Sequence, residues 1–263
     1  MFKFIFSQFF SLIILFSVVS IPSYAKELTI FAGKNAPFNF RHRGAITGVT
    51  VQILESIFKD ANLPFDQKKI VFDSWSAVFS QAIVTSDSLL ITASRIPERE
   101  SLFQWIGPVA TVRLAIVAKK NTVKIKKLDD LKNYNVASVK NTSAERAYVK
   151  KGGDLSTFSR ISTPKQGYRM LEYGRIDALI CTDLPFVYSL IKQGQNVDDY
   201  EIVYVIKNTK YYIAAHKDLS AKTMNILEDG LAKLKQKNSK NISQYDTIMA
   251  NYFKGKILSE KSK

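Results

Sequence analysis

Cysteine and histidine are scarce in this chain of 263 residues, which has one Cys, Cys181, and two His, His42 and His216. A lone Cys excludes an internal disulfide and a cysteine-based metal site. Two widely separated His residues disfavour a Ser-His-Asp triad and a His-rich metal centre. Cys181 ends the run 177–181 (Asp-Ala-Leu-Ile-Cys), which indicates a buried strand with the thiol as a small core side chain. The sequence therefore predicts no metal site, no cofactor and no catalytic residue.

Long apolar runs are absent after residue 25. Before it, a short basic start (Met-Phe-Lys) precedes an apolar stretch over residues 4–21 and then Pro-Ser-Tyr-Ala at 22–25. This is the tripartite pattern of a secretory signal peptide, and it predicts that residues 1–25 are removed and that the mature protein is periplasmic. The alternative is a retained membrane anchor, but a spanning helix needs about 20 predominantly apolar residues, and this stretch is shorter and interrupted by polar side chains. Lys26 rather than Cys follows the cleavage point, so no lipid anchor is expected.

Acidic residues are outnumbered, with 23 Asp and Glu against 38 Lys and Arg, which gives a formal net charge of +15. Loss of Lys3 with the signal peptide lowers this to +14. Such a charge is typical of proteins that bind nucleic acid or anionic membranes. An exported chain with its Lys residues spread along the sequence disfavours nucleic acid, and the short clusters at 124–127 and 233–240 are typical of solvated surfaces. We therefore expect no nucleic-acid partner.

Flexible linkers, low-complexity segments and short repeats are also absent, and the chain instead alternates β-rich runs with amphipathic stretches. In the stretch 50–61, apolar residues recur at helical spacing, which predicts a helix. Strands are predicted at 28–32, 69–72, 88–92, 113–118, 135–139, 176–181 and 211–215, and helices at 50–61, 74–84, 163–174, 185–193, 220–235 and 242–253. Two further helices are predicted to begin at Pro97 and at Thr142. Strands that alternate with helices indicate an α/β fold with mainly parallel sheets. The pattern restarts near residue 112, which predicts two lobes.

Several short motifs occur in a fixed order along the mature chain. They are 36–40 (Ala-Pro-Phe-Asn-Phe), 46–49 (Ile-Thr-Gly-Val), 87–99 (Asp-Ser-Leu-Leu-Ile-Thr-Ala-Ser-Arg-Ile-Pro-Glu-Arg), 128–132, 136–139, 141–145, 174–178 and 212–214. Each motif alone is weakly specific, but their order and spacing together resemble the amino-acid-binding family of periplasmic substrate-binding proteins of ABC transporters, also called solute-binding protein family 3. The resemblance covers essentially the whole mature chain.

The resemblance implies a two-lobed periplasmic-binding-protein fold of type II, in which each lobe is a mainly parallel sheet flanked by helices. Two crossover strands near residues 109–113 and 206–211 would form the hinge, and the lobes would close over one ligand. Residues 26–111 and 210–263 are then expected to form the first lobe, and 112–209 the second. The implied partners are a small-molecule ligand and the permease of an ABC transporter, with the protein itself a monomer.

The resemblance places Arg99 at the family's ligand-carboxylate arginine. A guanidinium suits this role because its planar fork pairs with both carboxylate oxygens and stays charged. The alternative is a surface Arg in a charged turn. Thr92 and Ser94 match family positions that surround the ligand, and as alternate residues of a strand they are expected to point to the same side.

In the second lobe, Thr142 and Ser143 are expected to begin a helix whose amide groups attract an anion, although plain helix capping explains them equally well. Asp183 is the candidate for the ligand's α-ammonium group. Here the sequence departs from the family pattern, because the family acid stands one position earlier, where this chain has Thr182.

Phe38, Phe40 and Trp75 are candidates for the apolar walls of the pocket, with core packing as the alternative for each; Trp75, just after an Asp-Ser helix start, is the favoured one. Family members that bind basic amino acids place an acid in the first loop, where this chain has Ala32. The expected ligand is therefore a small carboxylate-bearing solute, with a neutral or acidic polar amino acid as the leading class.

Two other function classes remain open. An enzyme on the same scaffold, such as a cyclohexadienyl dehydratase, needs a positioned acid or base in the cleft, and neither His stands at a matched site position. A ligand-sensing adaptor would report the ligand to a membrane receptor in trans. We expect a binding protein rather than an enzyme.

Overall fold

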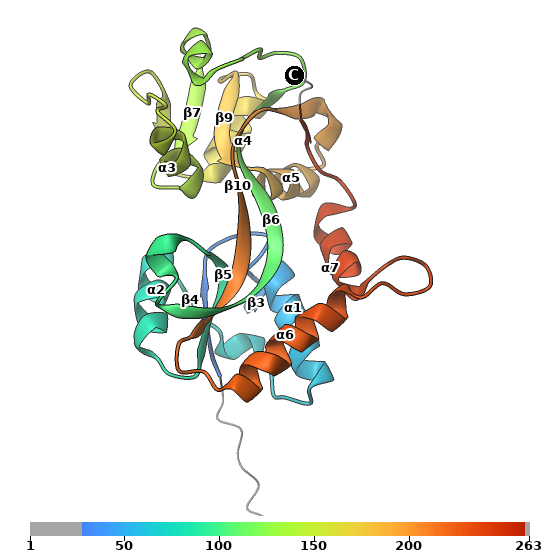
Figure 1. Ribbon diagram of the computed structural model, residues 1–263. Helices are drawn as coiled ribbons and strands as arrows, with labels where there is room; N and C mark the ends of the chain where they lie inside the picture. The colour runs from blue at the N-terminus through green and yellow to red at the C-terminus, as the bar shows by residue number, and fades with distance from the viewer. Residues whose placement is uncertain (1–27, 261–263) are drawn as a thin grey trace, which may run out of the picture.

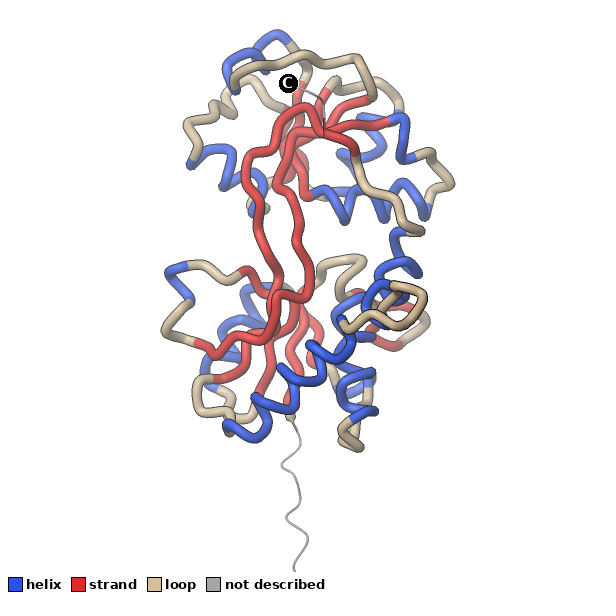
Figure 2. The backbone as a smooth tube through the Cα atoms, turned by 45° about the vertical axis from the view of Figure 1, so that its right-hand side comes forward, coloured by secondary structure: helices blue, strands red, loops and turns tan. Residues whose placement is uncertain are grey.

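The computed structural model describes residues 28–260, in two lobes joined by two long strands (Figures 1 and 2). The predicted signal peptide lies outside the described residues. The joining strands are β6 (Phe103–Lys119) and β10 (Tyr200–His216), which pair antiparallel along their whole length. Both predicted crossover regions, 109–113 and 206–211, lie within these strands.

The remaining elements divide between the two lobes. The first lobe contains β1 (Thr29–Gly33), β2 (Phe40–His42), β3 (Ala45–Thr47), α1 (Val49–Asp60), η1 (Gln67–Lys69), β4 (Val71–Asp73), α2 (Trp75–Val84), β5 (Ser88–Ser94), η2 (Pro97–Arg99), α6 (Ala221–Lys235) and α7 (Gln244–Phe253). The second lobe contains η3 (Leu128–Asn133), β7 (Val136–Val139), α3 (Ser143–Lys150), β8 (Ser159–Ile161), α4 (Pro164–Glu172), β9 (Ala178–Thr182), α5 (Asp183–Lys192), η4 (Val197–Asp199) and β11 (Ser259–Glu260).

One sheet runs through both lobes in the order β4-β1-β5-β10-β6-β9-β7-β8. The outer strands of each lobe, β4-β1-β5 and β9-β7-β8, are parallel, and the antiparallel pairs occur where β10 and β6 join them. Parallel strands need helical crossovers, which cover both faces of the sheet and require apolar residues on both. The predicted α/β fold with mainly parallel sheets is therefore confirmed.

In the first lobe the strands direct alternate side chains to two helical layers. Phe31 of β1 packs with Val78 of α2 on one face, whereas Ile30 and Ala32 pack with the cluster that includes Ile53 of α1 on the other. Successive side chains of a strand point to opposite faces, so a strand buried on both sides reads as a continuous apolar run. Figure 1 shows α2 on one side of the sheet and α1 and α6 on the other.

The end of the chain departs from the predicted lobe boundary. Residues 210–263 were assigned as a block to the first lobe, but β11 pairs in parallel with β10 at Glu201 and Ile202, on the second lobe. Leu258, which precedes it, is buried. The chain therefore returns to the second lobe after α7, and its last described residues form a third connection between the lobes (Figure 1). The chain returns because this buries the apolar side chain of Leu258 and pairs β11 with the open edge of β10.

Helix α5 also begins earlier than the sequence predicts. It starts at Asp183, directly after β9, rather than at Pro185 after a loop. Among residues 28–260, no helix has the length and apolar character that crossing a membrane requires.

Candidate functional site

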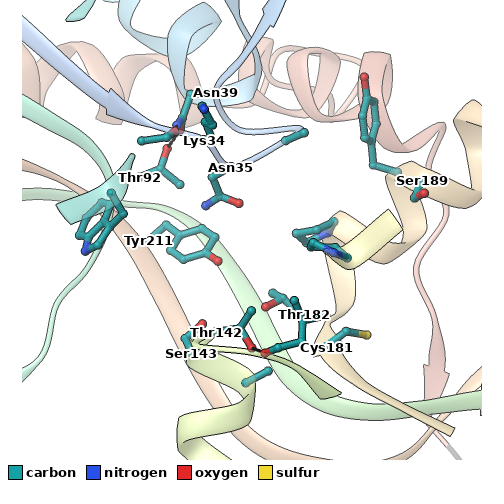
Figure 3. A pocket seen from close by; sticks show the side chains of 18 of the residues that line it. Lys34, Asn35, Asn39, Thr92, Thr142, Ser143, Cys181, Thr182, Ser189 and Tyr211 are labelled. Carbon is teal, nitrogen blue, oxygen red and sulfur yellow. Dashed lines mark hydrogen bonds between the residues drawn. The ribbon is translucent and has the colours of Figure 1, made fainter. Parts of the chain in front are cut away.

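A cavity of about 750 Å³ lies between the lobes and is lined by residues of both. Figure 3 shows Thr92 and Asn39 of the first lobe on one side, Thr142, Ser143 and Thr182 of the second lobe on the other, and Tyr211 between them. Six of the predicted site residues line this cavity. They are Trp75, Thr92, Ser94, Arg99, Thr142 and Ser143.

Arg99 is held in the first lobe by two rings and a carbonyl. Its guanidinium lies 5.1 Å from the ring centroid of Trp75 and 5.0 Å from that of Phe79, and its Nη1 donates to the carbonyl oxygen of Ser94 over 3.2 Å. The two rings attract the cation and leave further N–H groups for a ligand. Burial first, and then the positive charge of Arg146 across the cavity, lower the pKa of Arg99. The Arg99 guanidinium is therefore a positioned cation that can bind an anionic ligand.

Trp75 is positioned by the start of α2. The hydroxyl of Ser74 accepts the backbone N–H of Ala77 over 3.4 Å, which caps the helix and places Trp75 at its first position. The indole packs against β1, where a Cβ at Gly33 would lie 3.1 Å from it. A larger residue at 33 would push the ring away from Arg99.

Thr92 and Ser94 both line the cavity, in different ways. Thr92 is only 4% exposed, and its hydroxyl bonds to Oδ1 of Asn39 and lies 2.9 Å from the hydroxyl of Thr50. Its φ of 60° is unusual for a β-branched residue and coincides with a register shift in the pairing of β5 with β10. Thr92 therefore braces the wall, while Ser94 supplies the carbonyl that orients Arg99.

In the second lobe Thr142 and Ser143 open α3 toward the cavity. The hydroxyl of Thr142 accepts the backbone N–H of Glu145 over 3.2 Å and donates to the carbonyl of Val139 over 2.9 Å. Its capping role is therefore satisfied within the protein. The amide groups of the first turn remain at the cavity wall, where the positive end of the helix dipole favours an anion.

Glu145, one turn into α3, is turned away from the cavity. Its carboxylate accepts from Arg160 Nη2 over 2.9 Å, from the Ser138 hydroxyl over 2.6 Å and from the backbone N–H of Asn141 over 3.1 Å. The hydrogen bond from Arg160 is the largest influence, and with Ser138 and Asn141 it outweighs burial and lowers the pKa of Glu145 to about 2. This acid is a structural anion.

Asp183 does not line the cavity, which corrects its prediction as the group facing a ligand's ammonium. It is 3% exposed, and its carboxylate accepts from Arg113 Nε over 2.7 Å, from the backbone N–H of Arg113 over 2.9 Å and from the backbone N–H of Leu184 over 2.7 Å. Because α5 begins at this residue without an intervening loop, the side chain points to the hinge strand β6. Thr182, one position earlier, faces the cavity instead.

Phe38 is fully buried and also lies outside the cavity lining, which corrects its prediction as a wall residue. Its ring meets that of Tyr211 edge to face, with centroids 5.0 Å apart. Tyr211 separates it from the cavity and is itself a wall residue. Phe40 packs across the lobes on Tyr188, with ring centroids 5.8 Å apart, and within the first lobe on Tyr252, with centroids 6.4 Å apart.

Tyr211 was not predicted as a site residue, although it lies at the centre of the cavity (Figure 3). It belongs to the hinge strand β10, and its phenol bonds to the side chains of Asn35 in the first lobe and Thr182 in the second. Burial raises its pKa, so the phenol is neutral and can donate. Its hydroxyl therefore touches both lobes at the point where they meet.

The cavity contains further polar residues that sequence reasoning missed. Arg146 stands four positions after Thr142, on the same face of a predicted helix, so its spacing was a usable indication. The others come from loops and from helix faces with no distinguishing pattern. They include Lys34, Asn35, Lys165, Lys192 and Gln193.

In the described part of the chain, no group of three or more His, Cys, Asp or Glu side chains is arranged to hold a metal ion. Cys181 reaches the cavity wall but is buried, and burial raises the pKa of its thiol well above the ordinary value. It is an unreactive thiol.

Comparisons with known proteins agree with this architecture. No family model matches the chain. A protein of Bacillus subtilis (strain 168) named "Probable amino-acid-binding protein YxeM" is 24% identical over 163 residues. The match covers 62% of this chain and 61% of that protein, which is less than two thirds of the relative's length.

Two solved structures have the same architecture over nearly their whole length. The substrate-binding protein of an amino acid ABC transporter superposes with a TM-score of 0.61 and 20% identity, covering 87% of this chain and 100% of that one. A histidine kinase sensor domain with similarity to periplasmic binding proteins gives a TM-score of 0.66 and 19% identity, covering 88% and 97%. At these identities the likeness shows the fold. The type II fold and the resemblance to amino-acid-type substrate-binding proteins, both predicted from the sequence, are confirmed.

Proposed function

We propose that this chain, which resembles amino-acid-type substrate-binding proteins in sequence and in fold, binds a small carboxylate-bearing solute between its lobes and delivers it to an ABC transporter. The observation behind the proposal is the state of Arg99. Its guanidinium is stacked on two rings at the cavity wall, and none of the ion pairs described within residues 28–260 includes it. A fixed, unneutralised guanidinium is a receptor for the two oxygens of a carboxylate.

The arrangement of the lobes supports a binding cycle. Two antiparallel strands join the lobes, so opening and closing require only small dihedral changes in β6 and β10. Arg99 is on one lobe and the start of α3 is on the other. A carboxylate bound to Arg99 would bring the second lobe toward it, and closure would exclude water and strengthen each polar contact.

The predicted ligand class is a neutral or acidic polar amino acid. Within residues 28–260, no Asp or Glu lines the cavity, which opposes a cationic ligand. No His of this described part lines it either, and this composition favours binding over acid–base catalysis of the dehydratase type. We assign no catalytic residue.

The proposed location is the periplasm. This location rests on the signal-peptide pattern of residues 1–25. The mature chain would act there as a monomer beside a permease. Fusing residues 1–25 to a reporter and detecting export and cleavage after Ala25 tests the location.

Calorimetry against a panel of amino acids and small carboxylates tests the binding role. We expect Arg99→Ala to weaken binding about 100-fold, the scale for removing one partner of a desolvated charge pair. Arg95→Ala is the matched control, because Arg95 lies in the same turn but pairs with the exposed Glu100 outside the cavity. Equal affinity of Arg99→Ala and the parent chain would remove Arg99 from the site and the proposal with it.

Sensing is the second candidate function, since the fold is shared with a histidine kinase sensor domain. A pull-down from envelope extracts with and without ligand separates the two. Recovery of a permease supports delivery, and recovery of a receptor in its place supports sensing.

A further inference from the structure

Positive charge lines the cavity from both lobes. Lys34 and Arg99 come from the first lobe, and Arg146, Lys165 and Lys192 from the second. None of the described residues that line the cavity is an Asp or a Glu. A cleft lined by one sign of charge attracts solutes of the opposite sign.

Two buried acids of the second lobe are paired with arginines outside the cavity. Asp183 pairs with Arg113 over 2.7 Å, and Glu145 with Arg160 over 2.9 Å. Both carboxylates are buried, and none of these four residues lines the cavity. These two acids therefore contribute structure and do not neutralise the cavity cations; the negative charge of Glu98 raises the pKa of Arg99, but less than burial and Arg146 lower it.

The cavity cations are not held in ion pairs by the described residues. None of the ion pairs described within residues 28–260 includes any of the five. Among the described residues, the hydrogen bonds of Arg99 and Arg146 go to main-chain carbonyls, those of Ser94 and Asn141, over 3.2 and 2.6 Å. The positive charge of Arg146 also contributes, after burial, to lowering the pKa of Arg99, so the two guanidinium groups repel each other across the cavity.

We propose that the ligand is a small dicarboxylate without an amino group, with one carboxylate on Arg99 and the other on Arg146. This inference rests on the proposed function: it keeps the small carboxylate-bearing solute and replaces the amino-acid class with a dicarboxylate. Two carboxylates satisfy one guanidinium on each lobe. An ammonium group would instead lose its hydration without meeting a carboxylate, and it would enter a field of its own sign.

The same geometry explains how the ligand would close the protein. Without it, the repulsion between Arg99 and Arg146 favours separation of the lobes. A dianion between them replaces the repulsion with two attractions, one on each lobe, so it binds the closed state more tightly than the open one. A monocarboxylate supplies only one of them.

Calorimetry with matched ligand pairs tests the inference. Succinate, glutarate and adipate are compared with aspartate, glutamate and 2-aminoadipate, so that each pair differs only by the amino group. Within the tightest pair, we expect the dicarboxylate to bind at least about tenfold more strongly. Arg146→Ala should weaken dicarboxylate binding by about tenfold or more, and added salt should weaken it further.

Lys150→Ala is the matched control, because Lys150 is an exposed cation of the same helix that does not line the cavity. It should leave the affinity within about threefold of the parent chain, and thermal unfolding confirms that each variant is folded. Tighter binding of an amino acid than of its dicarboxylate, or an Arg146→Ala variant that binds glutarate like the parent, would overturn the inference. If binding of that amino acid is still weakened by Arg99→Ala, the proposed function stands. If neither the dicarboxylates nor any amino acid binds, the inference and the proposed function are both wrong.

Discussion

Arg113 Nε donates to Oδ2 of Asp183 over 2.7 Å, and the backbone N–H of Arg113 donates to Oδ1 over 2.9 Å. The same guanidinium reaches Glu260 over 2.9 Å and the carbonyl of Leu258 over 3.0 Å. Burial alone lowers the pKa of Arg113, but its bonds to Asp183 and Glu260 outweigh this and raise it. One side chain of the hinge strand thus joins the start of α5 to the end of the chain.

Asp183→Asn is expected to lower the free energy of unfolding by about 3 kcal/mol, because it leaves a largely buried guanidinium without its main partner. Urea denaturation measures this. Glu260→Gln, which changes the exposed partner of the same Arg113, should cost less than about 1 kcal/mol. Because Asp183 faces away from the cavity, the ratio of glutarate to glutamate affinities should not change in Asp183→Asn. If Asp183→Asn selectively lost glutamate binding, Asp183 would contact the ammonium group of the ligand after all.

The pH dependence of stability should contain a contribution from Glu145. Its pKa is lowered from 4.5 to about 2 in the folded protein, so the folded state binds fewer protons than the unfolded state. The stabilisation, at most about 3 kcal/mol, is present above pH 4.5 and is lost as the pH falls toward 2. Urea denaturation of the parent and of Glu145→Gln should show a gap that narrows across this window. A gap independent of pH would contradict the assignment.

Trp75→Ala should weaken ligand binding by about 3- to 30-fold, since a stacked cation–π contact contributes roughly 0.5–2 kcal/mol and holds Arg99 in its plane. Trp75→Phe keeps a ring under the guanidinium and should stay within about threefold of the parent. Calorimetry with the tightest ligand makes the comparison. Equal losses in both variants would mean that the indole contacts the ligand directly rather than through Arg99.

Thr92→Val should destabilise the first lobe by about 1–3 kcal/mol, because it leaves the buried Oδ1 of Asn39 without the Thr92 hydroxyl. Thr92→Ser keeps that hydroxyl and should recover most of the loss. Thermal unfolding of the two variants checks this. A Val variant as stable as the parent would show that Asn39 does not depend on the Thr92 hydroxyl.

Most of the fold follows from sequence patterns that reflect burial. The run 89–91 (Leu-Leu-Ile) is apolar because β5 is covered on both faces, and Ser74 and Thr142 cap the helices where their spacing predicts. The long strands β6 and β10 were only partly predicted. Between the lobes their side chains at Thr111, Lys207 and Lys210 are exposed, so the hydrophobic pattern that indicates a strand fades there.

The site was less predictable, because it depends on side-chain direction. Arg99 and Trp75 stand in local motifs whose geometry follows from short-range contacts. Asp183 was misplaced because one position decides whether an acid follows a strand in a loop or begins a helix directly. Phe38 was misplaced because Tyr211, 173 residues later, covers it. The cavity cations of the second lobe could not be predicted, because only the fold places α3, α4 and α5 opposite Arg99.

A crystal structure of the chain with the tightest-binding member of the carboxylate panel tests the central claim most directly. The account predicts closed lobes, with both oxygens of one ligand carboxylate within hydrogen-bond distance of the Arg99 guanidinium. A ligand whose carboxylates contact other residues of the cavity, while Arg99 keeps only the carbonyl of Ser94, would contradict it.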